Sequence, residues 1–151
     1  MEPLDRRIVT LLARDSSASI SELVDLLGVP SSTLHQRIKK LEARGVITGY
    51  RAVIDQRAVG LGLHALVSLT PIDPSRPDDV AELLAPIPEV ESCWSVAGTE
   101  SYIVKVSVAE PVELEALLGR IRAVANVSTR TSVILSTPFE GRQAAIPEEG
   151  N

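Results

Sequence analysis

The sequence predicts an α+β fold in two parts, three short helices followed by a βαββαβ unit. Up to residue 50 the apolar residues recur at helical spacing, whereas from His64 onward the pattern indicates strand, helix, strand, strand, helix, strand. The charge changes near the same place. Residues 1 to 60 carry 9 Lys and Arg against 7 Asp and Glu, and residues 61 to 151 carry 6 against 13. Net charges of +2 and −7 indicate that the two parts meet different partners.

Composition excludes several classes of protein. No apolar run approaches the ~18 residues of a membrane helix, and the N-terminus lacks the basic and apolar regions of a signal peptide, so we expect a cytoplasmic protein without a membrane partner. A single cysteine, Cys93, excludes an intramolecular disulfide and a cysteine-rich zinc site. His35 and His64 are the only histidines, so we expect neither a metal site nor a cofactor.

The first two helices have clear sequence signals. Leu4, Ile8, Leu11 and Leu12 recur at one face, which predicts a helix from about Asp5 to Arg14. The stretch Ser19-Ile20-Ser21-Glu22 then has the Ser-x-x-Glu form of a capping box, in which each side chain satisfies a free backbone N–H of the other residue. A second helix is therefore expected from Ser19 to Leu27.

The third helix is predicted for Ser31 to Arg44, with both ends marked. Pro30 blocks the helix on its N-terminal side, Ser31 can cap it, and Gly45 supplies a left-handed stop. One side is an apolar stripe of Leu34, Ile38 and Leu41, and the other side is polar. Four basic residues against one Glu give this helix a net charge of +3.

The linked second and third helices have the layout of a helix-turn-helix. Gly28 permits a left-handed turn, Val29 fits between the helices, and Pro30 prevents continuation. In this motif the later helix enters the major groove of DNA. Three short helices with such a turn also occur in protein-binding bundles, but the basic outer face favours DNA. The expected DNA contacts are Ser31, Ser32, Thr33, His35, Gln36, Arg37, Lys39 and Lys40.

These residue types divide by role. Hydroxyls at the helix N-terminus suit phosphates and base edges, and Gln36 can pair with adenine. Lys39 and Lys40 would mainly set affinity for phosphates. Arg37 lies beside the apolar stripe and is as well placed to stabilise the fold through an ion pair as to touch DNA.

The segment after Gly45 is β-branched, and we expect Val46 to Ile54 to be extended, forming a wing and an exit strand. Gly60-Leu61-Gly62 resembles a hinge. The predicted domains are a winged helix-turn-helix at residues 1–50, a strand and hinge linker at 51–63, a ferredoxin-like unit at 64–135 and a loosely ordered tail at 136–151.

The βαββαβ order predicts a ferredoxin-like unit, one antiparallel sheet with two helices on one face. Val104, Val106 and Val108 are expected to face the helices, and Ile103, Lys105 and Ser107 to point away. Because the helix-free face of such a sheet is normally covered by another subunit, a homodimer is expected. The expected strands are His64–Thr70, Glu91–Ala97, Tyr102–Val108 and about Ser128–Leu135, with helices starting at Pro77 and Pro111.

From about Leu4 to Leu135 the chain resembles the bacterial Lrp/AsnC (leucine-responsive/asparagine-type, feast/famine) regulators. The matching stretches are Leu4 to Ile8, the turn Gly28 to Ser31, Arg37 to Glu42 with Gly45 to Ile47, and Cys93 to Tyr102. The resemblance implies that the C-terminal unit, called the RAM domain, pairs through its sheet into dimers that join into tetramers or octamers. It also implies that amino acids bind between dimers.

One stretch departs from the family's pattern. The family's turn between the second and third RAM strands reads Gly-Asp-aromatic-Asp-aromatic, whereas this chain has Gly98-Thr99-Glu100-Ser101-Tyr102. Either Glu100 contacts the effector's ammonium group, or the effector has changed, or no amino acid binds and the turn is only a polar hairpin. The expected effector contacts are Gly98, Thr99, Glu100, Ser101, Tyr102, Thr129, Thr131 and Ser132, the last three from the same or a neighbouring subunit.

The leading hypothesis is a sequence-specific transcriptional regulator that binds double-stranded DNA and responds to an amino acid. An alternative is a DNA-architectural protein of low sequence specificity with no small-molecule effector. A second alternative is a small enzyme with Cys93 as nucleophile and His64 as base. A cysteine inside an apolar strand is more often a packed hydrophobe, so we expect no enzyme.

Overall fold

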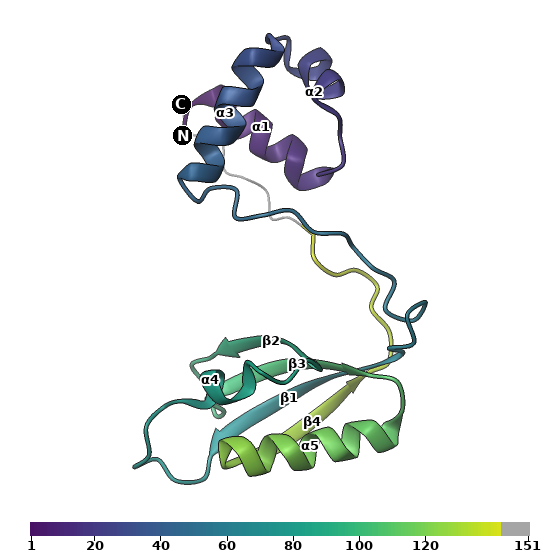
Figure 1. Ribbon diagram of the computed structural model, residues 1–151. Helices are drawn as coiled ribbons and strands as arrows, with labels where there is room; N and C mark the ends of the chain where they lie inside the picture. The colour runs from purple at the N-terminus through teal and green to yellow at the C-terminus, as the bar shows by residue number, and fades with distance from the viewer. Residues whose placement is uncertain (143–151) are drawn as a thin grey trace. The chain divides into compact units, whose positions relative to one another are not determined.

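The computed structural model describes residues 1–142. The chain divides into two compact units, one formed mainly by residues 1–53 and the other by residues 54–138. Figure 1 shows helices alone in the first unit and a sheet with helices in the second. The division after residue 53 falls inside the linker predicted for residues 51–63. No helix among the described residues is long and apolar enough to cross a membrane.

The first unit contains α1 (Pro3–Arg14), α2 (Ile20–Leu27) and α3 (Ser31–Ala43). The predicted capping box is confirmed, because the Ser19 hydroxyl accepts from the Glu22 backbone N–H while the Glu22 carboxylate accepts from the Ser19 N–H. Gly28 ends α2 at φ 68°, the left-handed conformation that glycine adopts at least cost. Apolar side chains from all three helices form one core: Ile8, Leu23, Leu27, Leu34 and Leu41.

Two predicted helix starts were wrong. The first helix begins at Pro3, not Asp5, because proline is well tolerated at the first helical position. Ser31 does not cap α3. Pro30 occupies the capping position in an extended conformation, without a side-chain hydrogen bond, and Ser31 is the first helical residue.

The predicted wing and exit strand are absent. Within the described chain no strand lies between α3 and β1. Instead, Val46 and Ile47 close the end of α3, since their backbone N–H groups donate to the Leu41 carbonyl at 2.9 and 3.2 Å after Gly45 turns the chain at φ 68°. Both side chains pack against the helical core. Their β-branched, apolar character therefore serves helix capping and packing, not strand pairing.

The second unit is one antiparallel sheet in the order β2-β3-β1-β4. Its strands are β1 (Leu63–Pro71), β2 (Val90–Ser95), β3 (Tyr102–Val108) and β4 (Val127–Ile134), with helices α4 (Val80–Leu84) and α5 (Pro111–Ala125). The α+β prediction with a ferredoxin-like sheet is confirmed. As predicted, Val104, Val106 and Val108 are buried in the core formed with both helices.

Several boundaries differ from the prediction. α4 starts at Val80 and not Pro77, because the residues before it form a turn in which Asp78 accepts a hydrogen bond from the Tyr102 hydroxyl at 2.6 Å. β2 ends at Ser95, and its register with β3 shifts between Val90 and Ser92. Residues 136–142 of the predicted tail form no helix or strand, and residues 143–151 lie outside the described residues.

Candidate nucleic-acid interface and effector region

The outer face of α3 is largely exposed in the part of the chain that the structure describes. Leu34 and Leu41 are fully buried on the inner side, so the helix is fixed in orientation by the core. Of the predicted DNA contacts, Thr33 and Arg37 are half-buried and the others are exposed: Ser31, Ser32, His35, Gln36, Lys39 and Lys40. The helix therefore presents hydroxyls near its N-terminus and two cations farther along a single polar face.

Arg37 points toward α1. Its guanidinium lies 2.5 Å from the Glu2 carboxylate and 3.3 Å from the Asp5 carboxylate. Hydrogen bonding to Glu2 raises the pKa of Arg37. Asp5 is only 1% exposed. Of the two roles predicted for Arg37, the structure supports the ion pair that joins α3 to α1.

His35 has a defined hydrogen-bonding state. Its Nδ1 lies 2.8 Å from the Ser31 carbonyl oxygen, one helical turn back. A carbonyl can only accept, so Nδ1 must carry the proton. In the neutral imidazole the exposed Nε2 is then an acceptor.

The β2–β3 turn brings together part of the predicted effector site. The Glu100 carboxylate accepts from the Ser68 hydroxyl at 3.2 Å and lies 3.7 Å from the Arg130 guanidinium. Thr99, Glu100 and Thr129 line the same shallow depression of about 190 Å³. Ser68 and Arg130 were missed from the sequence, because finding them requires the register that sets Arg130 opposite Ser68 on β1 and β4.

Other predicted effector residues lie elsewhere. Tyr102 is buried, and its hydroxyl donates to Asp78. Thr129 and Thr131 lie two residues apart on β4 and project from the same face of the sheet, whereas Ser132 projects from the opposite face. Gly98 and Ser101 remain in the turn, where the Ser101 N–H donates to the Leu69 carbonyl at 3.0 Å. One chain therefore does not gather all eight residues around one point.

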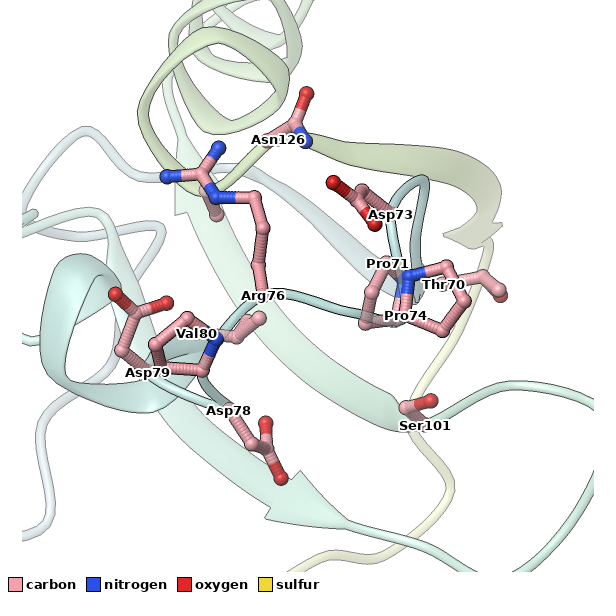
Figure 2. Close-up of a pocket in the computed structure, with 12 residues that line it drawn as sticks. Thr70, Pro71, Asp73, Pro74, Arg76, Asp78, Asp79, Val80, Ser101 and Asn126 are labelled. Carbon is pink, nitrogen blue, oxygen red and sulfur yellow. The ribbon is translucent and has the colours of Figure 1, made fainter.

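A larger cavity, of about 350 Å³, lies beside this turn (Figure 2). It is bounded by the end of β1, the loop from Pro71 to Asp79, Ser101 of the turn and the α5–β4 junction at Asn126. In the figure Pro71 and Pro74 lie on the right, Asp79 on the left, and Arg76 extends between them toward Asn126. Nothing in the residue order of this loop signals a cavity, so the sequence analysis did not find it.

The residues of the enzyme hypothesis are not together. Cys93 pairs with Val104, which faces the helices, whereas His64 pairs with Ser107 on the opposite face. His64 Nδ1 lies 2.7 Å from the Ser107 hydroxyl. Cys93 is exposed and not packed as a buried hydrophobe, and its partial desolvation raises the pKa of the thiol, which disfavours the nucleophilic thiolate. Among residues 1–142 no group of three or more His, Cys, Asp or Glu side chains is placed to hold a metal ion.

Both parts of the chain match known protein families. Residues 64–144 match the family described as the Lrp/AsnC ligand binding domain, and residues 1–48 match one described as winged helix-turn-helix DNA-binding. The HTH-type transcriptional regulator LrpA of Mycobacterium tuberculosis is 49% identical, over 95% of both chains. The chain belongs to the Lrp/AsnC family.

Other Lrp/AsnC proteins extend the comparison. The HTH-type transcriptional regulator FL11 of Pyrococcus horikoshii is 30% identical over 97% of both chains. A solved feast or famine regulatory protein from M. tuberculosis, complexed with L-methionine, superimposes with a TM-score of 0.93 at 49% identity, over 95% of this chain and 97% of that one. As an Lrp/AsnC protein the chain is a transcriptional regulator with DNA-binding and ligand-binding domains, not an enzyme.

Proposed function

We propose that this Lrp/AsnC protein binds specific DNA sites through α3 and that an amino acid modulates the binding. The observation that carries the DNA part is the exposed polar face of α3, whose inner side is fixed by buried Leu34 and Leu41. A helix held in this way can enter a major groove without rearrangement of the core.

The polar groups proposed to contact DNA from α3, of which Thr33 is half-buried and the others are exposed, have a chemistry suited to DNA. Ser31, Ser32 and Thr33 can donate to phosphates or base edges at the helix N-terminus, and Gln36 matches the acceptor and donor pair of adenine. Lys39 and Lys40 add affinity for phosphates. Gln36→Ala should relax base preference at one position, at a cost of about 1 to 3 kcal/mol if the contact is bidentate. Unchanged selection from a random DNA library would contradict this role.

The proposed functional form is a homodimer that assembles further into tetramers or octamers. The support is the helix-free sheet face, on which Leu66 and Trp94 are 38% and 48% exposed although both are large and apolar. Exposed apolar side chains of this size are typical of contact surfaces between proteins. A dimer also presents two copies of α3, which a double-stranded site with two half-sites requires.

The proposed effector is an amino acid. The support is the match to a ligand-binding domain and the L-methionine complex of a relative at 49% identity. At the turn, the Glu100 carboxylate is the proposed contact for the ammonium group. Because Arg130 is 74% exposed, its guanidinium can leave Glu100 and meet the ligand's carboxylate instead.

The proposal is tested by a thermal-shift screen of the twenty amino acids, followed by gel shifts on the promoter of the neighbouring gene with bulk competitor DNA. We expect at least one amino acid to raise the melting temperature and to change promoter affinity. Equal affinity for promoter and bulk DNA, with no amino acid response, would indicate the architectural alternative.

A further inference from the structure

A groove lies on the helix-turn-helix unit, between α1, α2 and the loop that joins them, with a volume of about 420 Å³. Leu11 of α1 and both Leu23 and Leu26 of α2 line it. Leu26 is 60% exposed although its side chain is large and apolar. None of the eight residues predicted to contact DNA lines this groove. The unit therefore has an accessible apolar surface that is separate from the proposed DNA interface.

Three carboxylates surround this apolar surface. Asp15, Glu22 and Asp25 line the groove, and Arg14 is the one cation among its described lining residues. Three negative charges against one positive charge leave a net charge of −2. Residues 1–50 contain 6 Asp and Glu residues, so half of them lie at this one groove. Because carboxylates repel phosphates, this rim disfavours nucleic acid and favours a cationic ligand.

Local hydrogen bonds keep two of these carboxylates ionised. Hydrogen bonds from the Ser17 hydroxyl and backbone N–H lower the pKa of Asp15, and those from the Ser19 backbone N–H and hydroxyl lower the pKa of Glu22. The charge of Asp15 acts in the opposite direction on the pKa of Glu22, so the two carboxylates repel each other. A cation bound between them relieves this repulsion.

We propose that this groove binds a basic segment of another protein. A large apolar side chain of the segment packs against Leu26, and Lys or Arg side chains beside it pair with the carboxylates of the rim. An apolar floor inside a charged rim is an arrangement in which a few anchoring side chains dominate binding. The inference adds a protein partner to the proposed regulator, and it depends neither on the amino-acid response nor on DNA recognition.

A random peptide library displayed on phage tests this surface, with the full chain as the target. We expect the enriched peptides to combine a large apolar residue with several Lys or Arg residues. In fluorescence anisotropy, Leu26→Asp and Asp25→Lys should each weaken a selected peptide at least about tenfold, because the first removes the apolar contact and the second reverses a charge of the rim. Added salt should also weaken binding, since the three carboxylates are exposed.

Matched controls are Val112→Asp and Glu115→Lys, which introduce the same side chains at exposed positions of α5. Both should bind the selected peptides as the unmodified protein does. Leu26 and Asp25 are exposed, so their variants should keep the circular dichroism spectrum and melting temperature of the unmodified protein. If Leu26→Asp does not fold, the comparison of Asp25→Lys with Glu115→Lys decides the outcome.

Two results would overturn the proposal. The first is that no peptide can be enriched whose binding distinguishes the groove variants from the α5 controls. The second is that Leu26→Asp loses self-association in sedimentation while Val112→Asp retains it, which would assign the groove to a second copy of the chain. Neither result would affect the proposed binding of DNA through α3 or the proposed amino-acid response.

Discussion

The guanidinium of Arg37 in α3 lies 3.3 Å from the carboxylate of Asp5, which is 1% exposed at the start of α1. This contact joins the helix proposed to read DNA to the first helix of the chain. A buried carboxylate that loses its cationic partner is costly, because the desolvation of the charge is no longer offset.

Arg37→Gln should therefore destabilise the helix-turn-helix. We expect the free energy of unfolding, measured with urea, to fall by about 1 to 3 kcal/mol, because the buried Asp5 carboxylate loses its charged hydrogen-bond donor. Asp5→Asn combined with Arg37→Gln removes both charges and should recover much of the loss. A lower DNA affinity with unchanged stability would instead assign Arg37 to the DNA interface.

Lys39 and Lys40 should act on DNA without regard to sequence. Their joint replacement by Ala should weaken specific and nonspecific binding alike and reduce the slope of log K against log salt by about 0.9 for each lost phosphate contact. Fluorescence anisotropy at several salt concentrations measures both effects. An unchanged salt slope would remove this face of α3 from the phosphate backbone.

His35 should read an exocyclic amino group. With Nδ1 donating to Ser31, the neutral ring offers an acceptor at Nε2, which matches the amino donors of adenine and cytosine in the major groove. In the site selected from a random library, replacing one such base by purine or 2-pyrimidinone, which lack the amino group, should weaken binding about tenfold, roughly 1.4 kcal/mol. The same base replacement should leave the DNA affinity of the His35→Ala variant unchanged.

The hydroxyl of Tyr102 should titrate at an unusually high pH. Its hydrogen bond to Asp78, aided by burial, raises its pKa to about 12. Because the folded value lies above the ordinary value of about 10, the associated stability is fully present below pH 10 and is lost as the pH rises through about 12. In Tyr50→Phe, where Tyr102 is the remaining tyrosine, phenolate absorbance should appear near pH 12, and adding Asp78→Asn should move it toward 10.

The helix-free sheet face should control assembly. Leu66→Asp and Trp94→Lys each place a charge in the proposed contact and should shift the protein toward monomer in sedimentation. Val112→Lys on α5 is a matched control, since Val112 is also exposed but lies on a helix. If the Leu66 and Trp94 variants retain the oligomeric state of the unmodified protein, subunits associate through another surface.

Local signals in the sequence predicted most of the fold. Gly28, the Ser19 capping box and the alternation of Val104, Val106 and Val108 each depend on neighbouring residues, and each was confirmed. The strand predicted at Val46 and Ile47 was wrong, because β-branched residues give the same sequence pattern whether they pair in a strand or cap a helix.

The effector region was harder to predict than the fold. Arg130 reaches Glu100 only through the β1–β4 register, and the cavity forms from segments about 55 residues apart, Pro71 and Asn126. By contrast, the exposed face of α3 followed from helical periodicity alone, since a single element carries all of it.

β1 follows directly after the linker, yet it lies inside the sheet, paired with β3 on one side and with β4 on the other. Any tension carried along the linker toward Leu63 is therefore shared between two ladders of hydrogen bonds. A strand at the sheet's edge would be held by one ladder and could peel away bond by bond. Because β1 is paired on both sides, the ligand-binding unit should resist a force applied at Leu63. A pull from bound DNA should therefore extend the linker before it deforms the sheet.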